Sequence, residues 1–339
     1  MLYSEWKSKE IKKISILVKP CVLVLFCIGF LTGCNDASKP EKQWTHAVNS
    51  MYSAAISIDG HFAVVSSINH GTGYWGLAKN QRLYTWSHGK KDEQAILHVA
   101  ISSDNSHVVT ADKNSFVVWD TLKGTSIGYW KMKSHIKSVA ISNRGRYVLI
   151  GLVNDKAQHI DLLTGRRLEF LGHEGTINYV DLSSDGKYAL TMANDYKVLF
   201  WNTKTAQVIH SWQYDARIRL GLISPSLKYA FISVTGSTFD VWDLNTGKKV
   251  SKLEGGTREG IISAAAFSKN EERLVTGSAD GTIRLWQVSS GKRLQTWLSK
   301  VKRFFIPNGA IIYAVGFSHN QQSVITEASS GKGQVWKID

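Results

Sequence analysis

The sequence predicts an all-β protein built from repeated four-stranded antiparallel sheets. The stretch Gly260–Trp297 contains four short runs rich in β-branched and aromatic residues, and polar or glycine-bearing turns separate them. Runs of this length and composition are typical of an antiparallel meander. A lone four-stranded sheet leaves both faces and both edges exposed, so it requires further copies of itself.

Seven segments share an apolar strand that ends in a serine before a polar turn. The serines lie 40 to 50 residues apart, at Ser57, Ser102, Ser142, Ser183, Ser224, Ser268 and Ser318. A second landmark follows each serine by 17 or 18 residues: Trp75, Trp119, His159, Trp201, Trp242, Trp286 and Trp336. A third landmark follows 11 residues later: Trp86, Trp130, Phe170, Trp212, Leu253 and Trp297. This spacing indicates seven copies of one unit.

The repeated unit resembles the blade of the WD-repeat family. Its period matches, and the dipeptides Trp119-Asp120 and Trp242-Asp243 stand at the expected place, with drifted versions such as Trp201-Asn202. The resemblance runs from about Lys42 to the end of the chain. It implies a seven-bladed β-propeller of four-stranded antiparallel blades over residues 43–339.

The two ends of the repeat region predict how the ring closes. The seventh copy stops at Asp339, just after its third strand. Trp44 precedes Ser57 by 13 residues, as Phe170 precedes Ser183. We therefore expect the strand around Trp44 to be the missing fourth strand of the last blade, which would leave no open sheet edge at the junction.

The first 33 residues are typical of a secretory signal peptide. Five lysines lie within residues 1–20, the apolar run Cys21–Leu31 follows, and the segment ends in Leu31-Thr32-Gly33-Cys34. This ending resembles the bacterial lipobox, which implies cleavage before Cys34 and acylation of the Cys34 thiol. Residues 34–42 read as a polar tether. An uncleaved membrane anchor is the alternative.

The predicted processing has consequences for location and partners. We expect acyl chains on Cys34 to hold the protein at the bacterial cell envelope. Asn35, rather than aspartate, follows Cys34, which favours the periplasmic face of the outer membrane over the inner membrane. Cys21 and Cys27 leave with the signal peptide, so we expect no disulfide. The net charge of +14 suggests nucleic acid, but the export signal argues against that partner.

The fourth copy carries a polar set that the family resemblance assigns to structure. In that family a histidine, a serine or threonine, an aspartate and the tryptophan form hydrogen bonds inside a blade. The matching residues here are His173, Thr191, Asp195 and Trp201. Pairing every buried polar atom would stabilise the blade. The alternative is a catalytic triad of the same His, Thr and Asp.

Other copies keep only parts of this set. The sixth has Thr276, Asp280 and Trp286, but Arg258 stands where the histidine would be. The second keeps Thr110 and Asp112, and the third keeps Asp155 alone. We therefore expect an incomplete set outside the fourth copy.

The sequence predicts no enzyme, metal site or cofactor. It contains no zinc-hydrolase helix, no glycine-rich phosphate loop and no nucleophile elbow. Asp181 stands out because five of the other six copies have alanine or glycine at its place on the inner strand. It could line the central channel and bind a cation or water, or it could pair with a neighbour.

Three connections between blades are candidate binding loops, since loops carry function in rigid folds. They are Ser87–Gln94; Tyr214–Leu220, with Arg217 and Arg219; and Leu298–Ile312, with Lys300, Lys302, Arg303, Phe304 and Phe305. Exposed aromatics beside arginine are typical of interface anchors. In the alternative, the two phenylalanines fold back onto the last blade and the basic residues are merely solvated.

These observations predict a non-catalytic scaffold. We expect a lipid-anchored, periplasm-facing, monomeric propeller that binds another envelope protein through its loops, with no nucleic-acid partner. The alternative function is a lactonase-like or quinoprotein-like propeller enzyme with a site in the central channel.

Overall fold

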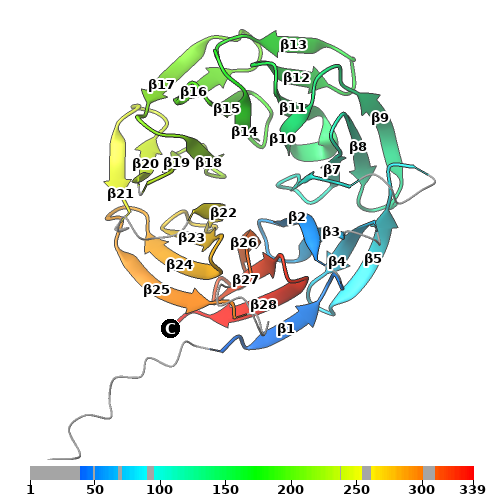
Figure 1. The fold of residues 1–339 in the computed structure, drawn as a ribbon, viewed down its shortest axis with the longest axis vertical. Coiled ribbons are helices and arrows are strands. Elements are labelled where there is room, and N and C mark those ends of the chain that lie inside the picture. The colour runs from blue at the N-terminus through cyan, green and yellow to red at the C-terminus, as the bar shows by residue number, and fades with distance from the viewer. Residues whose placement is uncertain are drawn as a thin grey trace, which may run out of the picture. The chain divides into compact units, whose positions relative to one another are not determined.

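The computed structural model describes residues 39–48, 50–67, 71–89, 95–236, 238–253, 261–300 and 310–339. Within residues 37–339 the strands form seven four-stranded antiparallel sheets arranged as a ring (Figure 1). The predicted seven-bladed propeller is therefore confirmed.

Each blade is a meander whose first strand lies at the centre of the ring and whose last strand lies outside. Blades one to three contain β2 (Met51–Ile56), β3 (Phe62–Ser67), β4 (Thr72–Gly76), β5 (Gln81–Trp86), β6 (His98–Ile101), β7 (His107–Ala111), β8 (Ser115–Asp120), β9 (Ser126–Lys131), β10 (Ile136–Ile141), β11 (Tyr147–Leu152), β12 (Ala157–Asp161) and β13 (Arg167–Phe170). Blades four and five contain β14 (Ile177–Leu182), β15 (Tyr188–Ala193), β16 (Lys197–Asn202), β17 (Val208–Gln213), β18 (Ile218–Ile223), β19 (Tyr229–Val234), β20 (Thr238–Asp243) and β21 (Lys249–Lys252). Blades six and seven contain β22 (Ile262–Phe267), β23 (Arg273–Ser278), β24 (Thr282–Gln287), β25 (Arg293–Leu298), β26 (Ile312–Phe317), β27 (Ser323–Ala328), β28 (Lys332–Lys337) and β1 (Lys42–Thr45).

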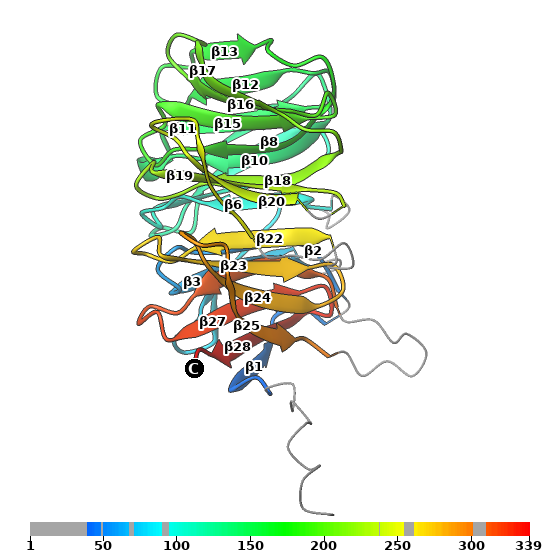
Figure 2. The ribbon, with the colours of Figure 1, turned by 90° about the vertical axis from the view of Figure 1, so that its left-hand side faces the viewer.

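The ring closes through the first strand of the chain, as predicted. β1 lies beside β28 (Figure 2) and pairs with it antiparallel. In this pairing Trp44 lies opposite Gly333. The inner strands β2, β6, β10, β14, β18, β22 and β26 each contact the next, and β26 contacts β2. Blade seven therefore joins both ends of the repeat region.

The repeated serine has a structural role in all seven blades. Its hydroxyl accepts a hydrogen bond of 2.9–3.0 Å from the backbone N–H five residues later. The third residue after each serine has a positive φ, and it is a glycine in three turns: Gly60, Gly145 and Gly186. Local side-chain bonds and left-handed residues of this kind define tight turns. The serine thus sets the bend between the first two strands of every blade.

The hydrophobic core lies between neighbouring blades. One buried cluster joins β7 and β8 to β10, β11 and β12, and another joins blades six and seven. The third-strand residues Trp201, Trp286 and Trp336 are almost completely buried. Phe170, from the preceding blade, stacks on Trp201 with ring centroids 4.1 Å apart. Such stacking adds to the burial of large apolar surface.

One predicted landmark is corrected by the strand register. His159 pairs with Leu149 as Phe200 pairs with Leu190, so Ile160 rather than His159 lies at the tryptophan position of blade three. The number of residues between the repeated serine and the tryptophan is 17 in some blades and 18 in others. The sequence alone therefore does not show whether His159 or Ile160 takes the tryptophan position. Leu253 keeps its landmark place: it lies just beyond β21, is buried, and its N–H donates to the Phe239 carbonyl.

Candidate functional site

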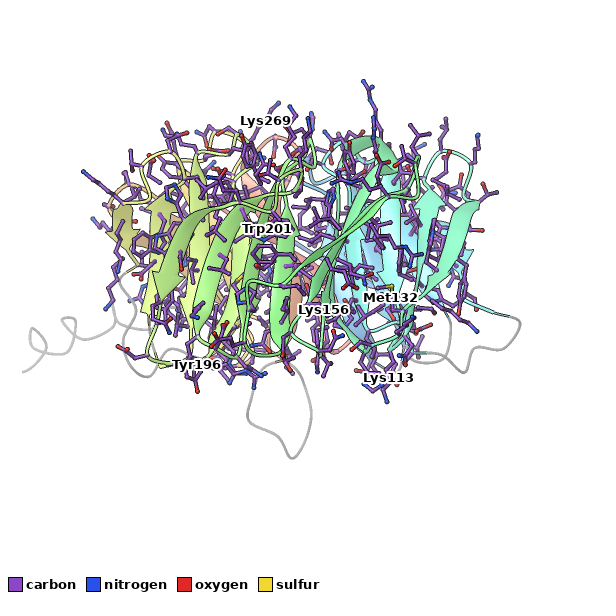
Figure 3. The ribbon with its side chains drawn as sticks, turned by 90° about the horizontal axis from the view of Figure 1, so that it is seen from above. Lys113, Met132, Lys156, Tyr196, Trp201 and Lys269 are labelled. Carbon is purple, nitrogen blue, oxygen red and sulfur yellow. The ribbon has the colours of Figure 1, made fainter. Side chains whose placement is uncertain are left out.

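The two faces of the ring carry different connections because the blades are antiparallel meanders. One face has the turns between the first and second strands and between the third and fourth. The opposite face has the turns between the second and third strands and the connections to the next blade. We call this second face the loop rim. Figure 3 shows Lys113 and Tyr196 of the loop rim on one side of the ring and Lys269 on the other.

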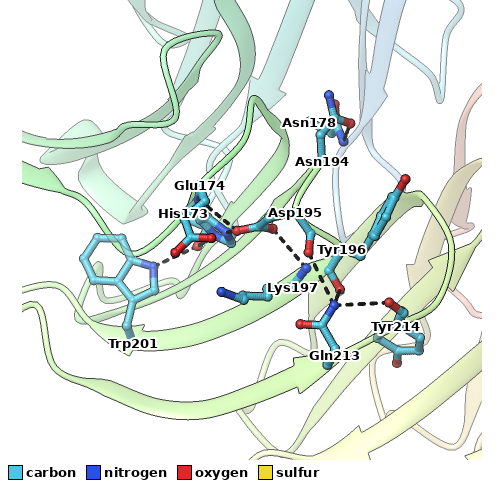
Figure 4. Close-up of polar contacts among 11 residues, drawn as sticks. His173, Glu174, Asn178, Asn194, Asp195, Tyr196, Lys197, Trp201, Gln213 and Tyr214 are labelled. Carbon is cyan, nitrogen blue, oxygen red and sulfur yellow. Dashed lines mark hydrogen bonds and ion pairs between the residues drawn. The ribbon is translucent and has the colours of Figure 1, made fainter.

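The four residues predicted to form a polar set in blade four are brought together. His173 Nδ1 lies 2.9 Å from Asp195 Oδ2, and His173 Nε2 lies 2.9 Å from Thr191 Oγ1. Trp201 Nε1 donates to the same Thr191 hydroxyl at 3.2 Å (Figure 4). Asp195 also accepts from the backbone N–H groups of Glu174 and Lys197.

The electrostatics of this set fit a structural role. Burial lowers the pKa of His173 more than the hydrogen bond and charge of Asp195 raise it. Burial would raise the pKa of Asp195, but backbone donors and His173 outweigh it and hold that pKa below its usual value. Thr191 and Trp201 are fully buried, so no substrate reaches the hydroxyl. The set holds the blade together rather than presenting a nucleophile.

Blade two contains a second complete set, which corrects the expectation that only the fourth copy keeps one. His88 Nδ1 lies 3.0 Å from Asp112 Oδ2, and His88 Nε2 lies 2.8 Å from Thr110 Oγ1. Trp119 Nε1 donates to Thr110 at 2.8 Å. His88 was missed because its loop is longer, which places it 14 residues before Ser102, whereas His173 lies 10 before Ser183. Its position two residues after the landmark Trp86 could have identified it in the sequence.

Blade five replaces the set with a residue from the predicted binding loop. The Tyr214 hydroxyl accepts from Trp242 Nε1 at 2.9 Å and donates to Asp240 at 3.2 Å. Lys249 pairs with Asp240 at 2.9 Å. Tyr214 therefore anchors the start of the segment that carries Arg217 and Arg219.

Blades six and seven keep the inner half of the set. Trp286 Nε1 donates to Thr276 at 2.9 Å, and Trp336 Nε1 donates to Thr326 at 3.1 Å. Arg258, at the histidine position of blade six, lies outside the described residues.

The described part of the predicted binding surface lies on the loop rim. Arg219 Nε donates to Thr235 at 2.8 Å, and Arg217 makes one long contact of 3.5 Å to Asn178. Within the described ranges, neither arginine forms an ion pair with a carboxylate. Lys300 follows Ser299, whose hydroxyl donates to Gln334. Lys302, Arg303, Phe304 and Phe305 lie outside the described residues, as does Cys34.

The structure adds residues that the sequence analysis missed. Lys137 stands at the same place on β10 as Arg219 on β18, five residues before the repeated serine. Blades three and five thus place cations at the loop-rim ends of their inner strands, and blade four has Asn178 at the same place. We call these loop-rim ends, which surround the opening of the central channel, the channel mouth. Apolar residues at the corresponding ends of the inner strands are partly exposed in the other blades: Tyr52 (39%), Leu97 (36%), Ile261 (47%) and Ile311 (36%).

The central channel holds a cavity of about 280 Å³ lined by the inner strands of all seven blades. Asp181 lies on its wall, and its carboxylate accepts hydrogen bonds from the N–H groups of Leu182 (2.9 Å) and Ile223 (2.7 Å). Burial raises the pKa of Asp181 to about 6 despite these bonds. The carboxylate links blade four to blade five, as in the pairing alternative.

The described part of the chain contains no group of three or more His, Cys, Asp and Glu residues that could hold a metal ion. Nor does any helix in those residues have the length and apolar character needed to cross a membrane.

Comparisons with known proteins agree with this architecture. Residues 165–202 and 247–287 match the family model of the WD domain, G-beta repeat. The chain is 29% identical to the small ribosomal subunit protein RACK1 of Drosophila melanogaster, over 35% of this chain and 39% of the relative. It is 26% identical to transducin-like enhancer protein 2 of Mus musculus, over 72% of this chain and 27% of the relative.

A third relative is matched over more of its own length. The chain is 26% identical to the serine-threonine kinase receptor-associated protein of Gallus gallus, over 60% of this chain and 69% of the relative. The first two relatives are matched over well under half of their length. The chain therefore contains WD40 repeats, folded as blades of a seven-bladed propeller, and it is similar to WD-repeat proteins.

Proposed function

We propose that this protein is a non-catalytic, lipid-anchored scaffold that binds another protein of the bacterial envelope through its loop rim. The observation that carries the proposal is the composition of the channel mouth. Lys137, Arg217 and Arg219 lie there without carboxylate partners in the described ranges, and exposed apolar side chains lie on the other blades.

This composition fits a protein partner with an acidic segment beside an apolar one. Unpaired cations at a rim accelerate encounter with an acidic surface and suppress basic partners. Apolar and aromatic side chains supply the buried centre of an interface, where most of the binding energy resides. The rigid ring fixes the distance between the cations and the apolar side chains.

The anchoring part of the proposal rests on Leu31-Thr32-Gly33-Cys34, with residues 1–33 as signal peptide and 34–42 as tether. Labelling cells with an alkyne analogue of palmitate would test it. We expect the native chain to be labelled and to fractionate with outer membranes, while Cys34→Ser is unlabelled. An unlabelled native chain would refute lipidation, and labelled chain in the inner-membrane fraction would refute the outer-membrane assignment.

Chemical crosslinking in intact cells, followed by mass spectrometry, tests the rim. The native chain is compared with a variant in which Arg217, Arg219 and Lys300 are replaced by serine. A second variant replaces Lys302, Arg303, Phe304 and Phe305. We expect each variant to lose a crosslinked partner that the native chain captures. Unchanged partners in both variants would refute this site.

A further inference from the structure

A cavity of about 370 Å³ lies between blades three and four, on the face opposite the loop rim. Its walls come from β11, β12 and β13 of blade three and from the turns around Gly186 and Thr203 in blade four. This volume is within the range of about 300–1,000 Å³ typical of small-molecule sites. Neither the predicted binding loops nor the channel contributes to it.

Blade three lacks one ring of an aromatic ladder that blades one and four have. In blade four, Tyr188, Phe200 and His210 stack in sequence on the second, third and fourth strands, with centroids 5.5 and 6.1 Å apart. Blade one has the equivalent ladder of Phe62, Tyr74 and Tyr84. Blade three begins the same way, with Tyr147 and His159 at 5.0 Å, but the residue paired with His159 on the fourth strand is Leu168.

Leu168 also lacks the polar contact that other blades make at this position. Tyr84 donates from its hydroxyl to the Leu122 carbonyl at 3.0 Å, and His210 Nε2 lies 2.8 Å from the Leu244 carbonyl. Ser251 and Gln295 reach carbonyls of the following blade in the same way. A leucine side chain has no hydrogen-bonding atom and no ring, so the third place in the ladder of blade three holds an aliphatic group that lines the cavity.

The cavity wall contains a buried polar atom without a partner. His159 is 6% exposed, and its Nε2 forms no hydrogen bond. Burial lowers the pKa of His159 and the positive charge of Arg166 adds to this, which together outweigh the opposing effects of the Gly186 backbone and of Asp161. An unpaired buried nitrogen is costly, which favours a bound group that can pair with it.

The charges around the cavity leave two cations uncompensated. Asp161 is paired with Arg146 at 3.2 Å, and Lys187 is paired with Asp185 at 3.1 Å. Arg166 Nη2 donates to the Lys204 carbonyl at 3.4 Å, which places both residues at one wall. In the part of the chain that the structure describes, neither Arg166 nor Lys204 forms an ion pair.

We propose that this cavity binds a small aromatic acid, whose ring lies against Leu168 and His159 where the ladder has no third ring, and whose anionic group lies against Arg166 and Lys204. The ring would stack beside His159 as His210 stacks beside Phe200. A hydroxyl on the ring could reach the backbone of blade four, as the Tyr84 hydroxyl reaches blade two.

Titration calorimetry of the purified mature chain with 4-hydroxybenzoate tests the proposal, and 4-hydroxybenzamide serves as the neutral probe of the same shape. We expect saturable binding of the acid and at least about tenfold weaker binding of the amide, because a charge-assisted contact is lost. Replacing both cations, Arg166→Gln and Lys204→Gln, should weaken binding of the acid by a similar factor and leave the affinity for the amide unchanged.

The variant Leu168→Tyr supplies the missing ring from the protein itself. We expect it to abolish binding of both probes and to keep the melting temperature at or above that of the native chain. Lys269→Gln, on the same face but far from the cavity, is the matched control and should bind the acid as the native chain does. Absence of saturable acid binding, equal affinity for acid and amide, or retained binding in Leu168→Tyr would each overturn the proposal.

Discussion

His46 and Glu327 form a fully buried pair at the seam where the two ends of the ring meet. His46 Nδ1 lies 2.8 Å from Glu327 Oε1, and both side chains have zero exposure. His46 Nε2 also contacts Asn80 at 2.8 Å, and the His46 ring stacks on Trp75 at 4.4 Å. One imidazole thus connects β27 of the last blade to the first blade. The second oxygen, Glu327 Oε2, has no partner within the described residues.

Breaking this pair should destabilise the ring strongly. We expect Glu327→Ala to lower the free energy of unfolding by about 3–5 kcal/mol, because it removes the carboxylate of a buried pair and leaves His46 Nδ1 without its partner. Lys156→Ala, which breaks the exposed pair of Lys156 and Glu169 at 2.9 Å, is the control and should cost no more than about 1 kcal/mol. Urea unfolding measures both. An equal decrease in the free energy of unfolding for Glu327→Ala and Lys156→Ala would show that this pair does not hold the seam.

The pH dependence of stability should differ between two buried histidines. Burial would lower the pKa of His46, but the hydrogen bond and charge of Glu327, with Asn80, raise it. The stabilisation that protonated His46 gives to the folded state is therefore present below the unfolded-state pKa of about 6.5, and it is lost as the pH rises through the folded-state pKa. For His173, whose pKa is lowered mainly by burial, the contribution is present above about 6.5 and is lost as the pH falls.

Unfolding of the native chain, His46→Gln and His173→Gln over about pH 5.5–8.5 checks these signs. The stability difference between native and His46→Gln should shrink towards high pH. The difference between native and His173→Gln should shrink towards low pH. Parallel curves for the two variants would contradict the assigned directions.

The complete polar set in blade two should matter as much as the one in blade four. We expect Thr110→Val and Thr191→Val each to lower the melting temperature, because each leaves a buried indole N–H and an imidazole nitrogen unpaired, at about 1–3 kcal/mol. His135→Leu, at an exposed histidine, should change stability by less than about 0.5 kcal/mol. A harmless Thr110→Val would mean that blade two does not depend on its set.

The sequence contains most of the information about the blades, because their strands repeat large apolar residues at nearly fixed distances. Trp44 could be assigned to the closing strand for the same reason. His88 and His159 could not be placed, since a loop extended by four residues moves one and a one-residue difference in turn length shifts the other. The sequence also does not show which cations lack a carboxylate partner, as Arg217 and Lys137 do among the described residues, because that depends on neighbours from other blades.

Replacing a glycine at the seam should destabilise the protein more than replacing a glycine at an open turn. Gly331 has φ +78°, and a Cβ there would lie 1.9 Å from the Ala47 carbonyl oxygen. Gly165 has a similar φ of +73° but open space around its Cα. We expect Gly165→Ala to lower the free energy of unfolding by about 1–2 kcal/mol from backbone strain alone, and Gly331→Ala to lower it clearly more because the backbone at Ala47, just after β1, must shift. Equal thermal shifts for the two variants would argue against close packing of the seam.

The most direct test of the scaffold proposal reverses charge at the channel mouth and compares the two faces. Lys137→Glu, Arg217→Glu and Arg219→Glu are combined in one chain, and Lys269→Glu on the opposite face is the control. The amount of crosslinked partner recovered from intact cells is measured for each chain by quantitative mass spectrometry. We predict that the triple variant loses the partner by about tenfold or more while the control retains it. Equal recovery from the triple variant, the control and the native chain would contradict binding through the loop rim.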